Sequence, residues 1–164
     1  MKTPVDDVVE IEVRIRARPE TVFAYFIDPA LYVRWQGTST RLDPRPGGIY
    51  EVSMDDGSVA SGRYIAVEPP DRVVFTWGWV GDDTLPPGQS TVEVTFRGDR
   101  DDTIVRLRHL ALPSTASREQ HAQGWHHFLG RLVDVGAEAV GGAGEARDRE
   151  GRRPDGDRDR SATD

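Results

Sequence analysis

The chain has 164 residues, with 28 acidic and 21 basic side chains, a formal charge of -7 and 37% hydrophobic residues. This length suits one domain of ordinary size, and the acidic balance argues against general nucleic-acid binding, which requires a basic surface. The sequence contains no cysteine, which excludes disulfides, thiolate metal sites and a cysteine nucleophile. No apolar run approaches the roughly 18 residues of a membrane span, so we expect a cytoplasmic protein without membrane insertion.

Residues 8–17 alternate between apolar and charged side chains, which predicts a strand with one buried face. Pro19 suits the first turn of a helix, and apolar residues at helical spacing follow it as far as Ile27. Asp28-Pro29 then restarts the chain before a second short helix that includes Trp35. We therefore expect two short helices directly after the first strand.

From Thr40 onward, the apolar pattern changes to period two, with turn signals between short segments. Strands are predicted at residues 49–54, 59–67, 72–80, 90–97 and 103–112, with a further strand near Thr40. Because the connections between them are short, these strands are expected to be antiparallel neighbours.

The last ordered element is predicted to be a long helix, capped by Ser114 or Ser117. One face of this helix carries an apolar stripe with His121 and Phe128 on its flanks; the stripe consists of Trp125, Leu129, Leu132, Gly136 and Ala139. We expect Gly124 to mark a close approach to the sheet or a kink, because glycine costs about 1 kcal/mol relative to alanine in a helix.

The final 24 residues contain 13 charged side chains and no large apolar residue. Such a segment cannot bury enough apolar area to offset its ordering entropy. The composition therefore predicts one folded domain over residues 1–140 and a disordered, charged tail over residues 141–164.

These elements predict an α+β fold in which an antiparallel sheet covers its apolar face with the long C-terminal helix. A sheet that curves around one helix encloses a cavity unless large side chains fill it.

Short motifs follow one another in a fixed order between Val8 and Val140. These motifs are Pro19-Glu20-Thr21-Val22-Phe23, Trp35, Asp43-Pro44-Arg45-Pro46-Gly47-Gly48, Asp56-Gly57, Gly62, Glu68-Pro69-Pro70, Thr76-Trp77, Ser90-Thr91-Val92 and Gly124-Trp125. In these motifs and their order the chain resembles the START-like, SRPBCC superfamily, in the branch of the C-terminal domain of the activator of the heat-shock-protein-90 ATPase.

The resemblance implies a helix-grip fold, also called START-like or Bet v 1-like. In this fold a seven-stranded antiparallel sheet wraps around a long C-terminal helix and an apolar cavity. Family members bind lipids, polyketides or hormones, act as cyclases or hydrolases, or assist a chaperone. Function therefore depends on the chemistry of the pocket rather than on the fold.

Aromatic residues are the main candidates for binding a ligand, because Trp77 and Trp79 share one face of a strand. The alternative interpretation is that some of these rings belong to the core. The full candidate set is Trp35, Phe75, Trp77, Trp79, His109, His121, Trp125, Phe128 and Leu129.

Two histidines are the candidates for catalysis. If His109 and His121 both point into the cavity, they can orient a carbonyl group or act as an acid–base pair. The alternative is that each is a structural histidine with satisfied hydrogen bonds. His126 and His127 are adjacent and diverge on a helix, so we expect no metal site, and no cofactor is expected.

The leading hypothesis is a non-enzymatic protein that binds a hydrophobic or aromatic small molecule. The first alternative is a cyclase, dehydratase or hydrolase that acts on an aromatic or polyketide-like substrate. The second alternative is a chaperone-associated interaction module. The sequence leaves open whether the protein is a monomer or a homodimer.

Overall fold

Seven antiparallel strands form one sheet in the computed structural model, which describes residues 8–150. The strands are β1 (Val9–Ile15), β2 (Ser39–Leu42), β3 (Ile49–Ser53), β4 (Val59–Glu68), β5 (Arg72–Trp79), β6 (Ser90–Asp99) and β7 (Asp102–Leu110). Helices α1 (Pro19–Ala24) and α2 (Pro29–Tyr32) follow β1, and α3 (Thr115–Glu150) is the last element. This arrangement confirms the predicted helix-grip fold.

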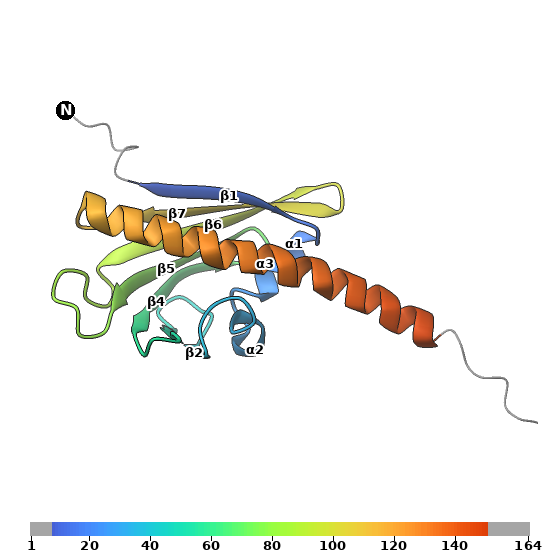
Figure 1. Cartoon of the computed structure of the whole chain (residues 1–164), viewed down its shortest axis with the longest axis horizontal. Coiled ribbons are helices and arrows are strands. Elements are labelled where there is room, and N and C mark those ends of the chain that lie inside the picture. Colours follow the sequence, from blue (N-terminus) through green and yellow to red (C-terminus); the bar gives the residue numbers. More distant parts are fainter. Residues whose placement is uncertain (1–7, 151–164) are drawn as a thin grey trace, which may run out of the picture.

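The strand order β1-β7-β6-β5-β4-β3-β2 places the first strand beside the last one. All other strands pair with their neighbours in sequence, because the hairpin connections between them are short. Helix α3 lies across one face of the sheet, and its C-terminal part extends past the strands (Figure 1).

The N-terminus of α3 is capped by Ser114, whose Oγ accepts a hydrogen bond from the backbone N–H of Ser117 at 3.0 Å. The apolar stripe faces the sheet as predicted, with Trp125, Leu129 and Leu132 buried. Capping and apolar periodicity were therefore sufficient to position this helix on the sheet.

The close approach to the sheet predicted at Gly124 is wrong. A Cβ atom at Gly124 would meet no atom within 4 Å, whereas one at Gly136 would lie 2.6 Å from Ile15 Cγ2. The close approach therefore occurs at Gly136, where α3 packs against β1. Gly124 instead leaves space open beside the helix.

The backbone of α3 stays helical through Glu150, beyond the boundary predicted at residue 140. Extending an existing helix adds one hydrogen bond per residue without a new nucleation step. The boundary at residue 140 was predicted from composition, which does not include this contribution. Residues 151–164 of the predicted tail lie outside the described residues. The domain boundary itself stays a prediction.

Aromatic side chains fill the interior between the sheet and the two short helices. Trp35 is fully buried, and its Nε1 donates a hydrogen bond to the Tyr25 carbonyl at 3.0 Å. Phe75 of β5 stacks on Tyr50 of β3 with ring centroids 4.0 Å apart. Trp35, Phe75 and Tyr50 therefore belong to the packed core.

Candidate functional site

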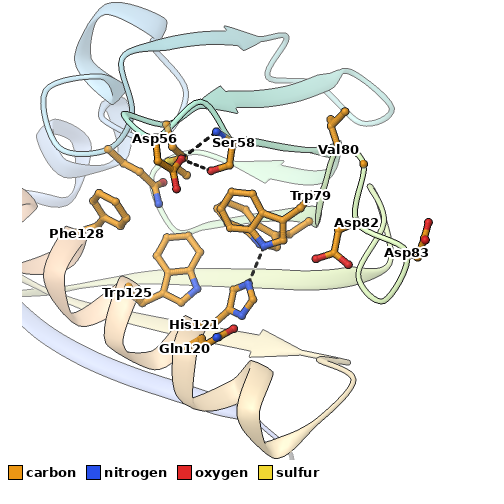
Figure 2. Close-up of a pocket in the computed structure, with 15 residues that line it drawn as sticks. Asp56, Ser58, Trp79, Val80, Asp82, Asp83, Gln120, His121, Trp125 and Phe128 are labelled. Carbon is orange, nitrogen blue, oxygen red and sulfur yellow. Dashed lines mark hydrogen bonds between the residues drawn. The ribbon is translucent and has the colours of Figure 1, made fainter.

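A pocket of about 690 Å³ opens between the N-terminal half of α3, the β3–β4 hairpin and the loop between β5 and β6 (Figure 2). This volume lies within the usual range for small-molecule sites. Its lining residues are Gln36, Met54, Asp56, Ser58, Trp77, Trp79, Val80, Gly81, Asp82, Asp83, Gln120, His121, Gly124, Trp125 and Phe128.

Indole rings form the wall of the pocket. Trp77 and Trp125 are each only 2% exposed, and their ring centroids lie 5.1 Å apart. Trp79 meets Trp77 edge to face at 5.3 Å, and Phe128 closes the wall from α3. Such a surface offers a large apolar contact area with directional stacking.

The β5–β6 loop forms one side of the mouth and is held by its own contacts. Asp82 Oδ1 accepts hydrogen bonds from the backbone N–H groups of Thr84 and Leu85, at 2.8 and 3.1 Å. Leu85 is buried, and its carbonyl accepts the N–H of Trp79 at 2.8 Å. The mouth is therefore formed before any ligand arrives, which reduces the ordering penalty of binding.

Gly78 allows this loop to fold back over β5. A Cβ atom at this position would lie 1.8 Å from the carbonyl oxygen of Pro86, a separation that no side chain tolerates. Only glycine permits the loop to approach the strand this closely, so the shape of the mouth depends on Gly78.

His121 connects α3 to β5 in the pocket wall. Trp79 Nε1–H donates to His121 Nε2 at 3.1 Å, as Figure 2 shows, and an indole nitrogen cannot accept in return. The proton of the imidazole therefore lies on Nδ1, which donates to the Ser117 carbonyl at 2.7 Å. Burial lowers the pKa of His121, which favours this neutral tautomer.

His109 lies deeper, on β7, and is fully buried. Trp125 Nε1–H donates to His109 Nδ1 at 3.0 Å, so the imidazole proton lies on Nε2 and donates to Ser90 Oγ at 2.8 Å. The Ser90 hydroxyl in turn donates to the Trp77 carbonyl at 2.7 Å. Burial lowers the pKa of His109 to about 3, with a smaller contribution from the charge of His121.

The two candidate catalytic residues thus lie close together without forming a free acid–base pair. Their ring centroids are 5.1 Å apart, but only His121 lines the pocket. Every ring nitrogen of both residues already has a hydrogen-bond partner. A proton transfer to substrate would first require one of these bonds to break.

The structure places five of the nine predicted ligand-binding residues in the pocket wall: Trp77, Trp79, His121, Trp125 and Phe128. The other four, Trp35, Phe75, His109 and Leu129, are buried in the core and do not line the pocket. Large side chains on the inner face pack against one another wherever they meet, so an inward position alone does not make a pocket residue.

Sequence reasoning missed the polar part of the lining, which comprises Gln36, Asp56, Ser58, Asp82, Asp83 and Gln120. The Asp-Gly turn and the polar loop were recognised only as connections between strands. No local pattern indicates that two such connections meet at one mouth, because that depends on how the sheet curves.

Within residues 8–150, no group of three or more histidine, aspartate or glutamate side chains has a geometry that could hold a metal ion. The same part of the chain contains no helix that is long and apolar enough to cross a membrane.

Solved structures resemble this chain over most of its length. An AHSA1-like protein of Rhizobium etli is 39% identical with a TM-score of 0.65, and the match covers 79% of this chain and 81% of that one. DynU16, a protein in the dynemicin biosynthetic locus, is 25% identical with a TM-score of 0.70. The second match covers 79% of this chain and 46% of DynU16.

An uncharacterized protein of Schizosaccharomyces pombe is 30% identical over 103 residues, which is 63% of this chain and 29% of the yeast protein. This chain therefore spans less than a third of the yeast relative. The family model of the Activator of Hsp90 ATPase homolog 1-like protein matches residues 16–137, which include the strands β2 to β7, the pocket and most of α3. The resemblance seen in the sequence is thereby confirmed, and the chain belongs to the Activator of Hsp90 ATPase homolog 1-like family.

Proposed function

We propose that this protein binds a hydrophobic, aromatic small molecule in the pocket and catalyses no reaction on it. This proposal rests on the pocket of about 690 Å³, whose lining includes Trp77, Trp79, Trp125 and Phe128. A concave site of this size with aromatic walls and a few polar groups is the usual form of a small-molecule site. The place of DynU16 in a biosynthetic locus also supports a small-molecule ligand.

The hydrogen bonds of the two histidines argue against the enzymatic alternative. A general acid or base needs a nitrogen within reach of the substrate proton and a pKa near the working pH. His109 has a pKa of about 3 and lies behind the pocket wall, while His121 already uses both nitrogens. Binding without chemistry therefore fits the site better than a cyclase, dehydratase or hydrolase.

Filling the pocket from Gly124 provides the direct test. In a titration with the neutral dye Nile red, we expect a saturable rise in emission for the wild-type chain and its loss in Gly124→Leu. Gly130→Leu is the matched control, because Gly130 is exposed on the same helix and a Cβ there meets no atom within 4 Å. Absence of dye binding to the wild type, or equal binding by the two variants, would count against the proposal.

A chaperone-associated role is the second candidate, and the description of the matching family favours it. It is tested by adding the full chain to an Hsp90 ATPase assay. We expect no change in the ATPase rate; a dose-dependent stimulation that Gly124→Leu retains would favour this second candidate over ligand binding.

A further inference from the structure

The orientation of the Gln36 amide follows from the hydroxyl groups behind it. Gln36 is 2% exposed, and its Oε1 accepts a hydrogen bond from the Tyr32 hydroxyl at 2.6 Å. The Tyr32 hydroxyl also pairs with that of Tyr50. Burial raises the pKa of both phenols well above the ordinary value, so each hydroxyl keeps its proton.

Only one arrangement gives the hydroxyl protons of both Tyr32 and Tyr50 an acceptor. Tyr50 donates to Tyr32, and Tyr32 donates to Gln36 Oε1. With the amide reversed, Gln36 would donate to Tyr32, Tyr32 would donate to Tyr50, and the Tyr50 proton would have no acceptor among the described residues. The amide Nε2 of Gln36 is therefore turned away from the tyrosines, and Gln36 is a lining residue of the pocket.

Two donors thus have no acceptor within the described part of the chain, and both belong to residues that line the pocket. Gln36 Nε2 makes no hydrogen bond within the described part of the chain, since the only bond of this side chain is at Oε1. Trp77 Nε1 is buried and is likewise without a partner there. Trp77 Nε1 is shielded from solvent, whereas Gln36 Nε2 is open to the pocket, so a ligand that presents an acceptor would gain a hydrogen bond at Gln36.

The mouth of the pocket carries carboxylates, which accept hydrogen bonds, rather than donors such as the Gln36 amide. Asp56, Asp82 and Asp83 lie among the lining residues, which include no arginine or lysine. Hydrogen bonds from Ser58 and Thr84 lower the pKa values of Asp56 and Asp82, so both are ionised at neutral pH. An anionic ligand would be repelled on entry, whereas a neutral one would not.

We propose that the ligand is an uncharged, planar aromatic ketone or quinone whose carbonyl oxygen accepts a hydrogen bond from Gln36 Nε2. This inference rests on the proposed function, because it names the ligand class for the same pocket.

Three tricyclic probes that differ in one substituent test this inference on the full chain: 9-fluorenone, fluorene and fluorene-9-carboxylate. Each is used to displace Nile red. We expect 9-fluorenone to displace the dye at an about three- to tenfold lower concentration than fluorene, as one neutral hydrogen bond allows. The carboxylate should be the weakest of the three.

Gln36→Glu is the informative variant, because its carboxylate still accepts the bond from Tyr32 but offers no donor to the ligand. The ratio of the displacing concentrations of fluorene and fluorenone, which does not depend on the affinity of the dye, should fall to about one in this variant. A second measurement uses the wild-type chain, so it remains valid even if Gln36→Glu does not fold. The side-chain amide resonance of Gln36 should shift on addition of fluorenone, and not on addition of fluorene.

The outcomes distinguish failure of the proposed ligand class from failure of the proposed ligand-binding function. Equal displacement by fluorene and fluorenone, an unmoved Gln36 resonance or tightest binding by the carboxylate would overturn the ligand class while Nile red binding stands. Failure of Nile red itself to bind would overturn the ligand-binding function and the ligand class together.

Discussion

Acidification should destabilise this protein through His109. The imidazole is fully buried and neutral, with Trp125 donating to Nδ1 and Nε2 donating to Ser90. Its pKa is about 3 in the folded chain, against an ordinary value of 6.5. Because the folded pKa is depressed, the unfolded state binds the proton first, and stability is lost as the pH falls from about 6.5 toward 3.

The expected size of the effect follows from these two values. Between pH 7 and pH 5, protonation of the unfolded state alone lowers the free energy of unfolding by about 2 kcal/mol. His121 changes stability in the same direction, because burial lowers its pKa as well. The carboxylates with lowered pKa values, Asp56 and Asp82, lose their charge only at lower pH.

Urea denaturation followed by circular dichroism at pH 7 and pH 5 measures this change. His109→Gln should remove most of the pH dependence, whereas His126→Gln, at an exposed position on α3, should retain it. Ser90→Ala should cost about 1–3 kcal/mol at pH 7, because it leaves His109 Nε2–H buried without an acceptor. A wild-type stability that is unchanged over this range, or an equal slope in His109→Gln, would refute the assignment of a buried neutral imidazole.

Two further substitutions test the surroundings of the α3 glycines, and a third tests the hydrogen bond between Trp79 and His121. Gly124→Ala should raise the free energy of unfolding by up to about 1 kcal/mol, since its Cβ meets nothing and alanine favours helix. Gly136→Ala should lower it by about 1–3 kcal/mol because its Cβ would overlap Ile15; equal effects in urea denaturation would contradict both. Trp79→Phe removes the donor to His121 Nε2, so the pKa of His121 should rise in an NMR titration; an unchanged pKa would show that this bond does not hold the tautomer.

The sequence predicted the elements well, because they depend on local periodicity. Alternation in residues 8–17 identified β1, and the spacing of Trp125, Leu129 and Leu132 identified the buried face of α3. The candidate site was predicted less completely. Phe75 and Trp77 lie on the same face of β5, yet Phe75 stacks on Tyr50 in the core while Trp77 borders the pocket.

The difference between these two residues depends on what the sheet brings opposite each of them. Tyr50 on β3 stacks on Phe75 with ring centroids 4.0 Å apart but lies 6.1 Å from the ring of Trp77. Trp77 instead contacts Trp79 and Trp125, which border the pocket with it. Strand alternation specifies the face of a side chain but contains no information about its neighbours across the sheet.

The sequence by itself determined the strands, the order of the helices, the acidic charge and the aromatic character of the inner face, all of which follow from local composition and period. Only the tertiary structure decided that Gln36, Asp82 and His121 meet at one pocket, and which nitrogen of each histidine holds its proton. Hydrogen bonds between residues far apart in the chain decide proton positions, and such partners exist only once the sheet has closed on α3.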